Sequence, residues 1–121
     1  MPHLALATRR IVVADDDADM RLYLTGCLRA FGVADVLEAA DGEAALLLAH
    51  EPGVGLVVAD LRMPGLDGEA LCRALHADAA TAAIPVLLIS GEAAGPPACA
   101  DGFLAKPFNA ARLRTHVERL F

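Results

Sequence analysis

Short hydrophobic runs alternate along this chain with longer segments whose apolar residues recur every three or four positions. A short Val- and Leu-rich run is typical of a buried strand in a parallel sheet, and the longer spacing is typical of an amphipathic helix. The runs predict strands over residues 9–14, 33–38, 55–60, 86–90 and 103–105. The spaced segments predict helices over residues 18–30, 42–50, 68–78 and a final stretch after residue 109. Strands that alternate with helices predict a doubly wound α/β fold, here as one domain over residues 1–121.

Polar residues mark the starts of the predicted helices. A side-chain oxygen just before a helix can accept a hydrogen bond from one of the first free backbone N–H groups. Residues of this kind precede all four predicted helices: Asp17, Asp41, Asp67 and Asn109.

The segment 91–102, between the last two predicted strands, breaks the alternation. It is too short for a full crossover helix, and Gly95-Pro96-Pro97 interrupts it. It predicts a loop with at most one helical turn, over about residues 97–101.

Composition limits the classes of partner and compartment. The net charge is −6 and the pI is about 5.0, which disfavours nucleic acid as a partner because phosphate contacts need clustered basic residues. No apolar stretch approaches the roughly 20 residues of a membrane span, and the first residues lack the pattern of a signal peptide. The cysteines at positions 27, 72 and 99 form no C-x-x-C pair, so free thiols in a reducing cytosol are expected. We therefore expect a cytoplasmic protein that binds neither nucleic acid nor membrane.

Two of the hydrophobic runs end in acidic residues. The first run leads into Asp15-Asp16-Asp17, and the third leads into Asp60. The carboxyl ends of parallel strands meet at one edge of the sheet, where such folds bind their ligands. Carboxylates this close raise each other's pKa unless a cation neutralises them. The pattern predicts a Mg²⁺ site of oxygen ligands, with Asp16 and Asp60 as candidate carboxylates.

Two further polar residues follow neighbouring strands. Ser90 ends the fourth strand, and Lys106, the only lysine of the chain, follows the fifth. A hydroxyl and an ammonium beside a metal site are groups that bind phosphoryl oxygens. Phosphoryl transfer depends mainly on positioning and charge neutralisation. Because Asp60 is central among these groups, we expect its carboxylate to be the acceptor nucleophile.

Four segments resemble the receiver domain of two-component response regulators. They are V-V-A-D-D-D at 12–17, V-A-D-L-R-M-P-G-L-D-G at 58–68, P-V-L-L-I-S-G at 85–91 and K-P-F at 106–108. The resemblance extends over essentially the whole chain, and its middle block is highly specific. It implies a CheY-like, flavodoxin-like fold: a five-stranded parallel sheet in the order 2-1-3-4-5. Receivers carry a fourth crossover helix where this chain has only the segment 91–102, so that helix is expected to be absent or reduced to about one turn.

The resemblance also implies a function. Asp60 would accept a phosphoryl group from a histidine kinase or a phosphotransfer protein, and the change would switch binding of a downstream protein partner. The chain would be a bacterial stand-alone receiver with no effector domain. It would catalyse only its own phosphorylation and dephosphorylation.

Each site residue receives a role from the same resemblance. Mg²⁺ would be held by Asp16, Asp60 and the backbone carbonyl of Arg62, with Asp15 acting through water. Lys106 would bind the phosphoryl group, and Lys106-Pro107 is a candidate cis peptide bond. Ser90 and Phe103 match the two switch positions. Position, rather than the resemblance, gives a last expectation: Arg62 and Glu92 each lie two residues past a strand end of the site, so they should overhang the pocket mouth and pair across it.

Three other assignments fit parts of the pattern. A calcium loop starting at Asp15 fails because Met20 and Gly26 stand where the turn glycine and the bidentate glutamate belong. A phosphatase of the haloacid dehalogenase type shares the D-x-D after a strand, but the chain lacks the expected Thr or Val and the length for a cap domain. A phosphorylation-independent interaction module stays open; the shortened segment favours it, and the complete acidic set opposes it. The histidines show no metal-ligand spacing and are expected at the surface: positions 3, 50, 76 and 116.

Overall fold

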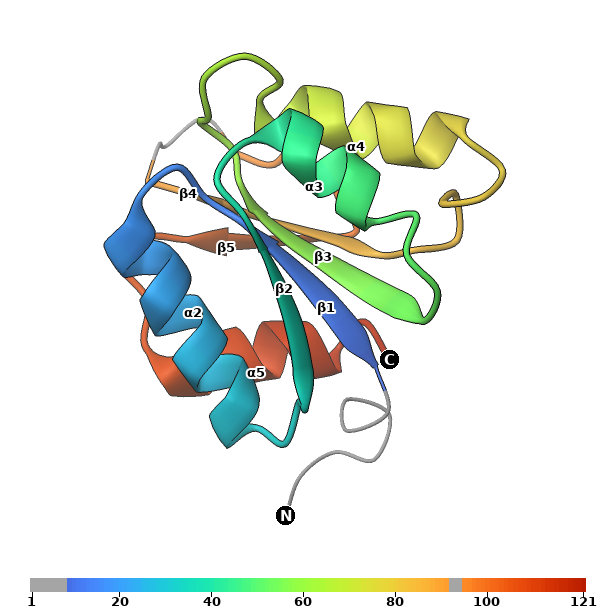
Figure 1. Cartoon of the computed structure of the whole chain (residues 1–121). Helices are drawn as coiled ribbons and strands as arrows, with labels where there is room; N and C mark the ends of the chain where they lie inside the picture. Colours follow the sequence, from blue (N-terminus) through green and yellow to red (C-terminus); the bar gives the residue numbers. More distant parts are fainter. Residues whose placement is uncertain (1–8, 92–94) are drawn as a thin grey trace.

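The chain folds into a parallel sheet with helices on both faces (Figure 1). The computed structural model describes residues 9–91 and 95–121. All strand pairs are parallel, and the order is β2-β1-β3-β4-β5, as predicted. The five strands are β1 (Arg10–Ala14), β2 (Asp35–Ala39), β3 (Val54–Asp60), β4 (Val86–Ser90) and β5 (Gly102–Ala105).

Four helices cover the sheet in two layers. Helices α2 and α5 pack on one face, and helices α3 and α4 pack on the other (Figure 1). Their bounds are α2 (Ala18–Ala30), α3 (Gly42–Leu48), α4 (Gly68–Ala77) and α5 (Ala110–Glu118). Among the described residues, no helix is long and apolar enough to cross a membrane.

All four predicted helix caps are confirmed. Each cap side chain accepts a hydrogen bond from a backbone N–H group in the first turn of its helix. The caps are Asp17 for α2, Asp41 for α3, Asp67 for α4 and Asn109 for α5.

Two element boundaries differ from the prediction by two residues, and the other differences are of one residue. Strand β2 begins at Asp35 rather than at residue 33, because the Val33 N–H donates to the Leu28 carbonyl and closes the end of α2. Gly32 makes this closure possible with a φ of 106°, a conformation that favours glycine. Helix α3 ends at Leu48 instead of residue 50.

Strands β1 and β3 are apolar at successive positions because helices cover both faces of the sheet. In β1 and β3, Ile11, Val13, Leu56 and Val58 face the α2 and α5 layer, whereas Val12 and Val57 face the opposite layer. All six are fully buried. Burying each such side chain contributes roughly 1.5–3 kcal/mol, so these strands form a rigid base for the residues at their ends.

The crossover from β4 to β5 carries no helix among its described residues, 91 and 95–101. A single turn forms there, closed by the Ala100 N–H on the Pro97 carbonyl at 3.1 Å. Asp101 fastens the segment to β4: its carboxylate accepts the Val86 N–H at 2.8 Å, and its own N–H donates to the Val86 carbonyl. Cys99 and Ala100 pack against the α3 and α4 layer. The predicted loss of this helix is confirmed, and a short packed segment takes its place.

Candidate functional site

Three carboxylates meet at the carboxyl edge of the sheet. Asp15 and Asp16 follow β1, and Asp60 ends the neighbouring strand β3. One carboxylate oxygen of each lies within 4.8 Å of the other two. The structure therefore brings together the acidic residues that the strand endings predicted to meet.

Burial makes this acidic cluster costly without a cation. Asp15 is 1% exposed and Asp60 is 8% exposed, whereas Asp16 is open to solvent. Burial raises the pKa of Asp15, and the neighbouring charges of Asp60 and Asp16 raise it further. The Asp17 N–H, which donates to the Asp15 carboxylate at 2.9 Å, opposes this shift. An arrangement of this kind favours a hard divalent cation.

Lys106 places a positive charge against Asp60. Its Nζ atom lies 3.1 Å from Oδ2 of Asp60, and the other oxygen, Oδ1, accepts the Arg62 N–H at 3.3 Å. The Lys106 side chain is 28% exposed and that of Asp60 is 11% exposed. The Asp60 carboxylate is thus oriented through both of its oxygens.

Strand pairing places Ser90 and Lys106 beside each other. Ser90 is buried at the end of β4, and its backbone carbonyl accepts the Lys106 N–H at 2.8 Å. The Lys106-Pro107 peptide bond is cis, as the resemblance implied. Phe103, in β5, is half-buried against the α3 and α4 layer. The expected switch roles of Ser90 and Phe103 stay predictions.

The loop after Asp60 is held close beneath the site. The Leu61 N–H donates to the Ile89 carbonyl at 2.8 Å, and the Leu61 carbonyl accepts the Gly68 N–H at 2.9 Å. A Cβ atom on Gly68 would lie 2.5 Å from the Asp60 carbonyl oxygen, so only glycine fits here. This contact explains the glycine at the end of the D-L-R-M-P-G-L-D-G block.

A hollow of about 320 Å³ opens beside the acidic cluster. Arg62 is exposed at its rim, and the structure does not test the role expected of its backbone carbonyl. Glu92, its expected partner, lies outside the described residues. The lining residues are Asp16, Arg62, Met63, Pro64, Gly65 and Asp67.

Two residues that brace the site were missed in the sequence. Arg21 donates to the Asp15 carbonyl at 2.7 Å and pairs with Glu38 of β2 at 3.6 Å. Glu43, at the start of α3, accepts the Leu66 N–H at 3.1 Å and so holds the loop that follows Asp60. Arg21 lies one turn after Asp17, the acidic cap of α2, and this spacing could have indicated a contact with the acidic residues. No local signal indicated Glu43, because its contact joins helix α3 to a loop that is distant in the sequence.

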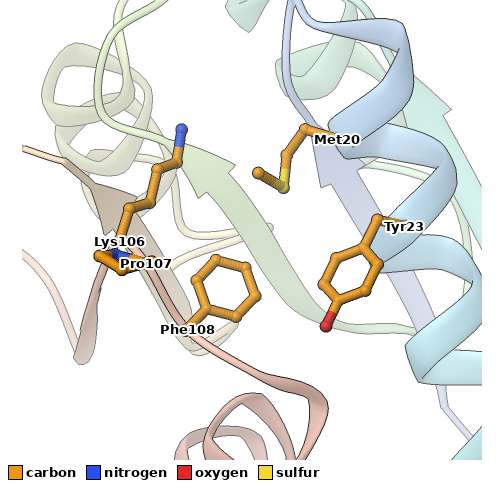
Figure 2. A pocket seen from close by; sticks show the side chains of 5 residues that line it. All are labelled: Met20, Tyr23, Lys106, Pro107 and Phe108. Atoms are coloured by element: carbon orange, nitrogen blue, oxygen red, sulfur yellow. The ribbon is translucent and has the colours of Figure 1, made fainter.

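A second hollow, of about 420 Å³, lies on the α2 side of Lys106 (Figure 2). Figure 2 shows Met20 and Tyr23 of α2 facing Phe108, with Pro107 beside it. The rings of Tyr23 and Phe108 have centroids 6.1 Å apart. The lining is therefore mainly apolar, and Lys106, which lines it, also contacts Asp60 of the acidic cluster.

Comparison with known proteins agrees with this geometry. The family model of the response regulator receiver domain matches residues 11–118. The chain is 34% identical to the chemotaxis protein CheY of Pseudomonas aeruginosa over 118 residues, which is 93% of this chain and 95% of that protein.

Solved structures give the same result. The chemotaxis protein CheY4 of Vibrio cholerae superposes with a TM-score of 0.85 at 26% identity, over 94% of this chain and 99% of that one. The receiver domain of a sensor histidine kinase from Pseudomonas aeruginosa, with a magnesium ion in its active-site cleft, superposes with a TM-score of 0.83 at 25% identity, over 93% and 96%. This chain belongs to the response regulator receiver domain family.

Proposed function

We propose that this chain is a phospho-accepting receiver whose Asp60 takes a phosphoryl group from a histidine kinase or a phosphotransfer protein. The observation that carries the proposal is the contact of Lys106 with Asp60 at 3.1 Å, beside a cluster of three carboxylates. An ammonium and a cation site beside one buried carboxylate would neutralise the charge of an incoming phosphoryl group.

The residues at this edge fit Mg²⁺. The ion prefers hard oxygen ligands and usually binds one or two protein carboxylates, with water and phosphate oxygens completing its shell. Asp16, Asp60 and the Arg62 carbonyl would hold it, with Asp15 acting through water. When bound, it neutralises the acidic cluster and the transferred phosphoryl oxygens.

The protein groups would act in a simple order. An oxygen of Asp60 attacks phosphorus, and the bond from phosphorus to the donor imidazole nitrogen breaks, which leaves an aspartyl phosphate. Lys106 then moves its contact from the carboxylate to a phosphoryl oxygen. The Ser90 hydroxyl donates to another phosphoryl oxygen, while the Arg62 N–H stays on the carboxylate.

Signal output would pass to a separate protein in the cytoplasm. The phosphoryl group adds roughly −1.5 to −2 charges to a buried site. Movement of Ser90 toward it would free space for Phe103, which packs at the same flank of the sheet, and the outer surface would change. A phosphoryl donor protein must also reach this edge. The apolar hollow beside Lys106, with Leu22 exposed on α2, offers a contact surface there.

A phosphorylation-independent interaction module is the second candidate. The missing helix between β4 and β5 favours it, because that flank belongs to the output surface of many receivers. The intact acidic cluster and the Lys106 contact oppose it, since such a module has no use for either.

Phosphorylation by a small donor separates the two functions. With acetyl phosphate and Mg²⁺, intact mass should show one added phosphoryl group on the wild-type protein. Asp60→Asn should show none with its fold intact, and Asp19→Asn, which changes an exposed helix acid, should be labelled like wild type. An unlabelled wild-type protein would favour the interaction module, and full labelling of Asp60→Asn would remove Asp60 as the acceptor.

A further inference from the structure

Two cysteines meet where the crossover from β4 to β5 packs on α4. The Cys72 thiol, in α4, donates to the backbone carbonyl of Cys99 at 3.1 Å. The Cys99 thiol donates to the Glu69 carbonyl, one turn earlier in α4, at 3.8 Å. Cys27, the third free cysteine, lies in the α2 and α5 layer on the other face of the sheet. The chain thus holds one close pair of thiols and one distant thiol.

The two thiols of this pair differ in access. Cys72 is fully buried, whereas Cys99 is only partly buried, in the crossover. Burial raises the pKa of the Cys72 thiol, and a hydrogen bond with the Cys99 side chain raises it further. Because a thiolate is the reactive form, an oxidant from solvent would reach and oxidise Cys99 first.

A histidine beside Cys72 can take its proton. His76 lies one turn later in α4, with Nδ1 3.9 Å from the Cys72 sulfur and Nε2 3.1 Å from the Asp101 carboxylate. The same carboxylate accepts the Val86 N–H, so its position is fixed by β4. A carboxylate only accepts hydrogen bonds, so Nε2 of the neutral ring carries the hydrogen and Nδ1 offers its lone pair to Cys72.

We propose that Cys72 and Cys99 form a reversible disulfide when a hydroperoxide oxidises the protein. The Cys99 thiolate attacks the peroxide oxygen, the O–O bond breaks, and water or an alcohol leaves, which gives a sulfenic acid at Cys99. Cys72 then gives its proton to His76 and its sulfur attacks the Cys99 sulfur. The S–O bond breaks, and the hydroxide takes up a proton and leaves as water. A low-molecular-weight thiol would restore both thiols and become oxidised to its own disulfide.

This bond would fasten the crossover to α4. In the reduced protein, Asp101 holds the segment to β4, while the thiol contacts hold it to α4. A disulfide would keep the crossover attached to α4. This attachment lies near β4, the strand that ends in Ser90. The modification needs none of the acidic cluster and is independent of the proposed phosphorylation.

Peroxide treatment followed by intact mass tests the proposal. The reduced protein, exposed to hydrogen peroxide, should lose two hydrogen atoms, and peptide mapping should join residue 72 to residue 99. The yield should not depend on protein concentration, and dithiothreitol should reverse it. Cys27→Ser should form the same disulfide with the same yield as the wild type. Oxidation that yields only disulfide-linked dimers, or bonds that include Cys27, would overturn the proposal.

Variants of the two steps give a second test. In Cys72→Ser, the sulfenic acid at Cys99 has no resolving thiol and should be trapped by dimedone. In Cys99→Ser, Cys72 should resist oxidation because it is buried. His76→Gln should slow the second step on the order of tenfold or more, with dimedone adducts at Cys99 increasing in proportion. An unchanged rate in His76→Gln would show that His76 is not the base. Oxidation of Cys72 in Cys99→Ser would overturn the proposed order, in which Cys99 is oxidised first.

Discussion

Nζ of Lys106 lies 3.1 Å from Oδ2 of Asp60, although 46 positions separate the two residues in the chain. They meet because β3 and β5 flank β4 and run in the same direction, so both strands end at one edge. The ammonium of Lys106 thus pairs with the Asp60 carboxylate in the unphosphorylated protein. It restrains the acceptor and also competes electrostatically with a cation bound to the same carboxylate.

Replacing Lys106 should therefore have opposite effects on metal binding and on phosphorylation. Lys106→Met keeps most of the apolar stem and removes the charge, so Mg²⁺ should bind a few-fold more tightly to the more negative cluster. Phosphorylation by acetyl phosphate should slow, on the order of tenfold or more, because the phosphoryl charge has lost a partner. Calorimetric titration and intact mass measure the two effects. Weaker Mg²⁺ binding in Lys106→Met would show that the lysine does not compete with the metal.

The two acids at the start of α2 should differ in their effect on Mg²⁺. Asp16 contributes an oxygen to the cluster, whereas the Asp17 side chain accepts the Asp19 N–H as the helix cap. Asp16→Ala should weaken Mg²⁺ binding more than about tenfold, since even outer-shell partners of a metal cost roughly 10–100-fold. Asp17→Ala should instead lower stability by about 1 kcal/mol through loss of the cap. Equal loss of Mg²⁺ affinity in both variants would disprove this division.

Asp15 should make the metal-free protein sensitive to pH. Its folded-state pKa lies above its ordinary value because of burial first, so the folded state binds the proton more tightly than the unfolded state. This proton-linked stability is present at low pH and is lost as the pH rises through the raised pKa. Asp15→Asn should accordingly raise the melting temperature near neutral pH without metal, with a smaller advantage as the pH falls. Mg²⁺ should favour the wild type; a variant that is less stable in metal-free neutral buffer would contradict the argument.

A pair of glycine variants tests the support beneath Asp60. The Cβ atom of Gly68→Ala would lie 2.5 Å from the Asp60 carbonyl oxygen and 2.8 Å from the Leu61 Cα atom. It should cost about 1–3 kcal/mol of unfolding free energy and slow phosphorylation by moving the acceptor strand end. Gly26→Ala, in mid-helix with no atom within 4 Å of the new Cβ, should stabilise by roughly 0.5–1 kcal/mol. Denaturant unfolding measures both, and similar effects at the two glycines would refute the close packing at Gly68.

Local chemistry explains most of what the sequence predicted correctly. Helix caps depend on one side chain and the next few N–H groups, so Asp17 and Asn109 were identifiable without tertiary information. The acids and Lys106 were identifiable because parallel strands must end at a common edge. The loss of the fourth crossover helix followed from the length and prolines of segment 91–102.

What the sequence did not reveal depends on contacts between distant segments. Glu43 braces the loop at Leu66 across 23 positions, and no pattern in either segment records it. Strand β2 begins later than predicted because the Val33 N–H donates to a carbonyl at the end of α2 rather than to a neighbouring strand. The contact of Cys72 with Cys99 likewise requires the crossover to fold back onto α4, which spacing alone does not indicate.

The identity of the acceptor is the central claim, and borohydride trapping tests it most directly. Borohydride reduces an acyl phosphate, but not a free carboxylate, to the alcohol homoserine. Protein phosphorylated with acetyl phosphate and Mg²⁺ should yield homoserine at position 60, identified by peptide sequencing in the mass spectrometer, and none when Mg²⁺ is chelated. Homoserine at position 15 or 16, or its complete absence from a phosphorylated sample, would contradict Asp60 as the phosphoryl acceptor.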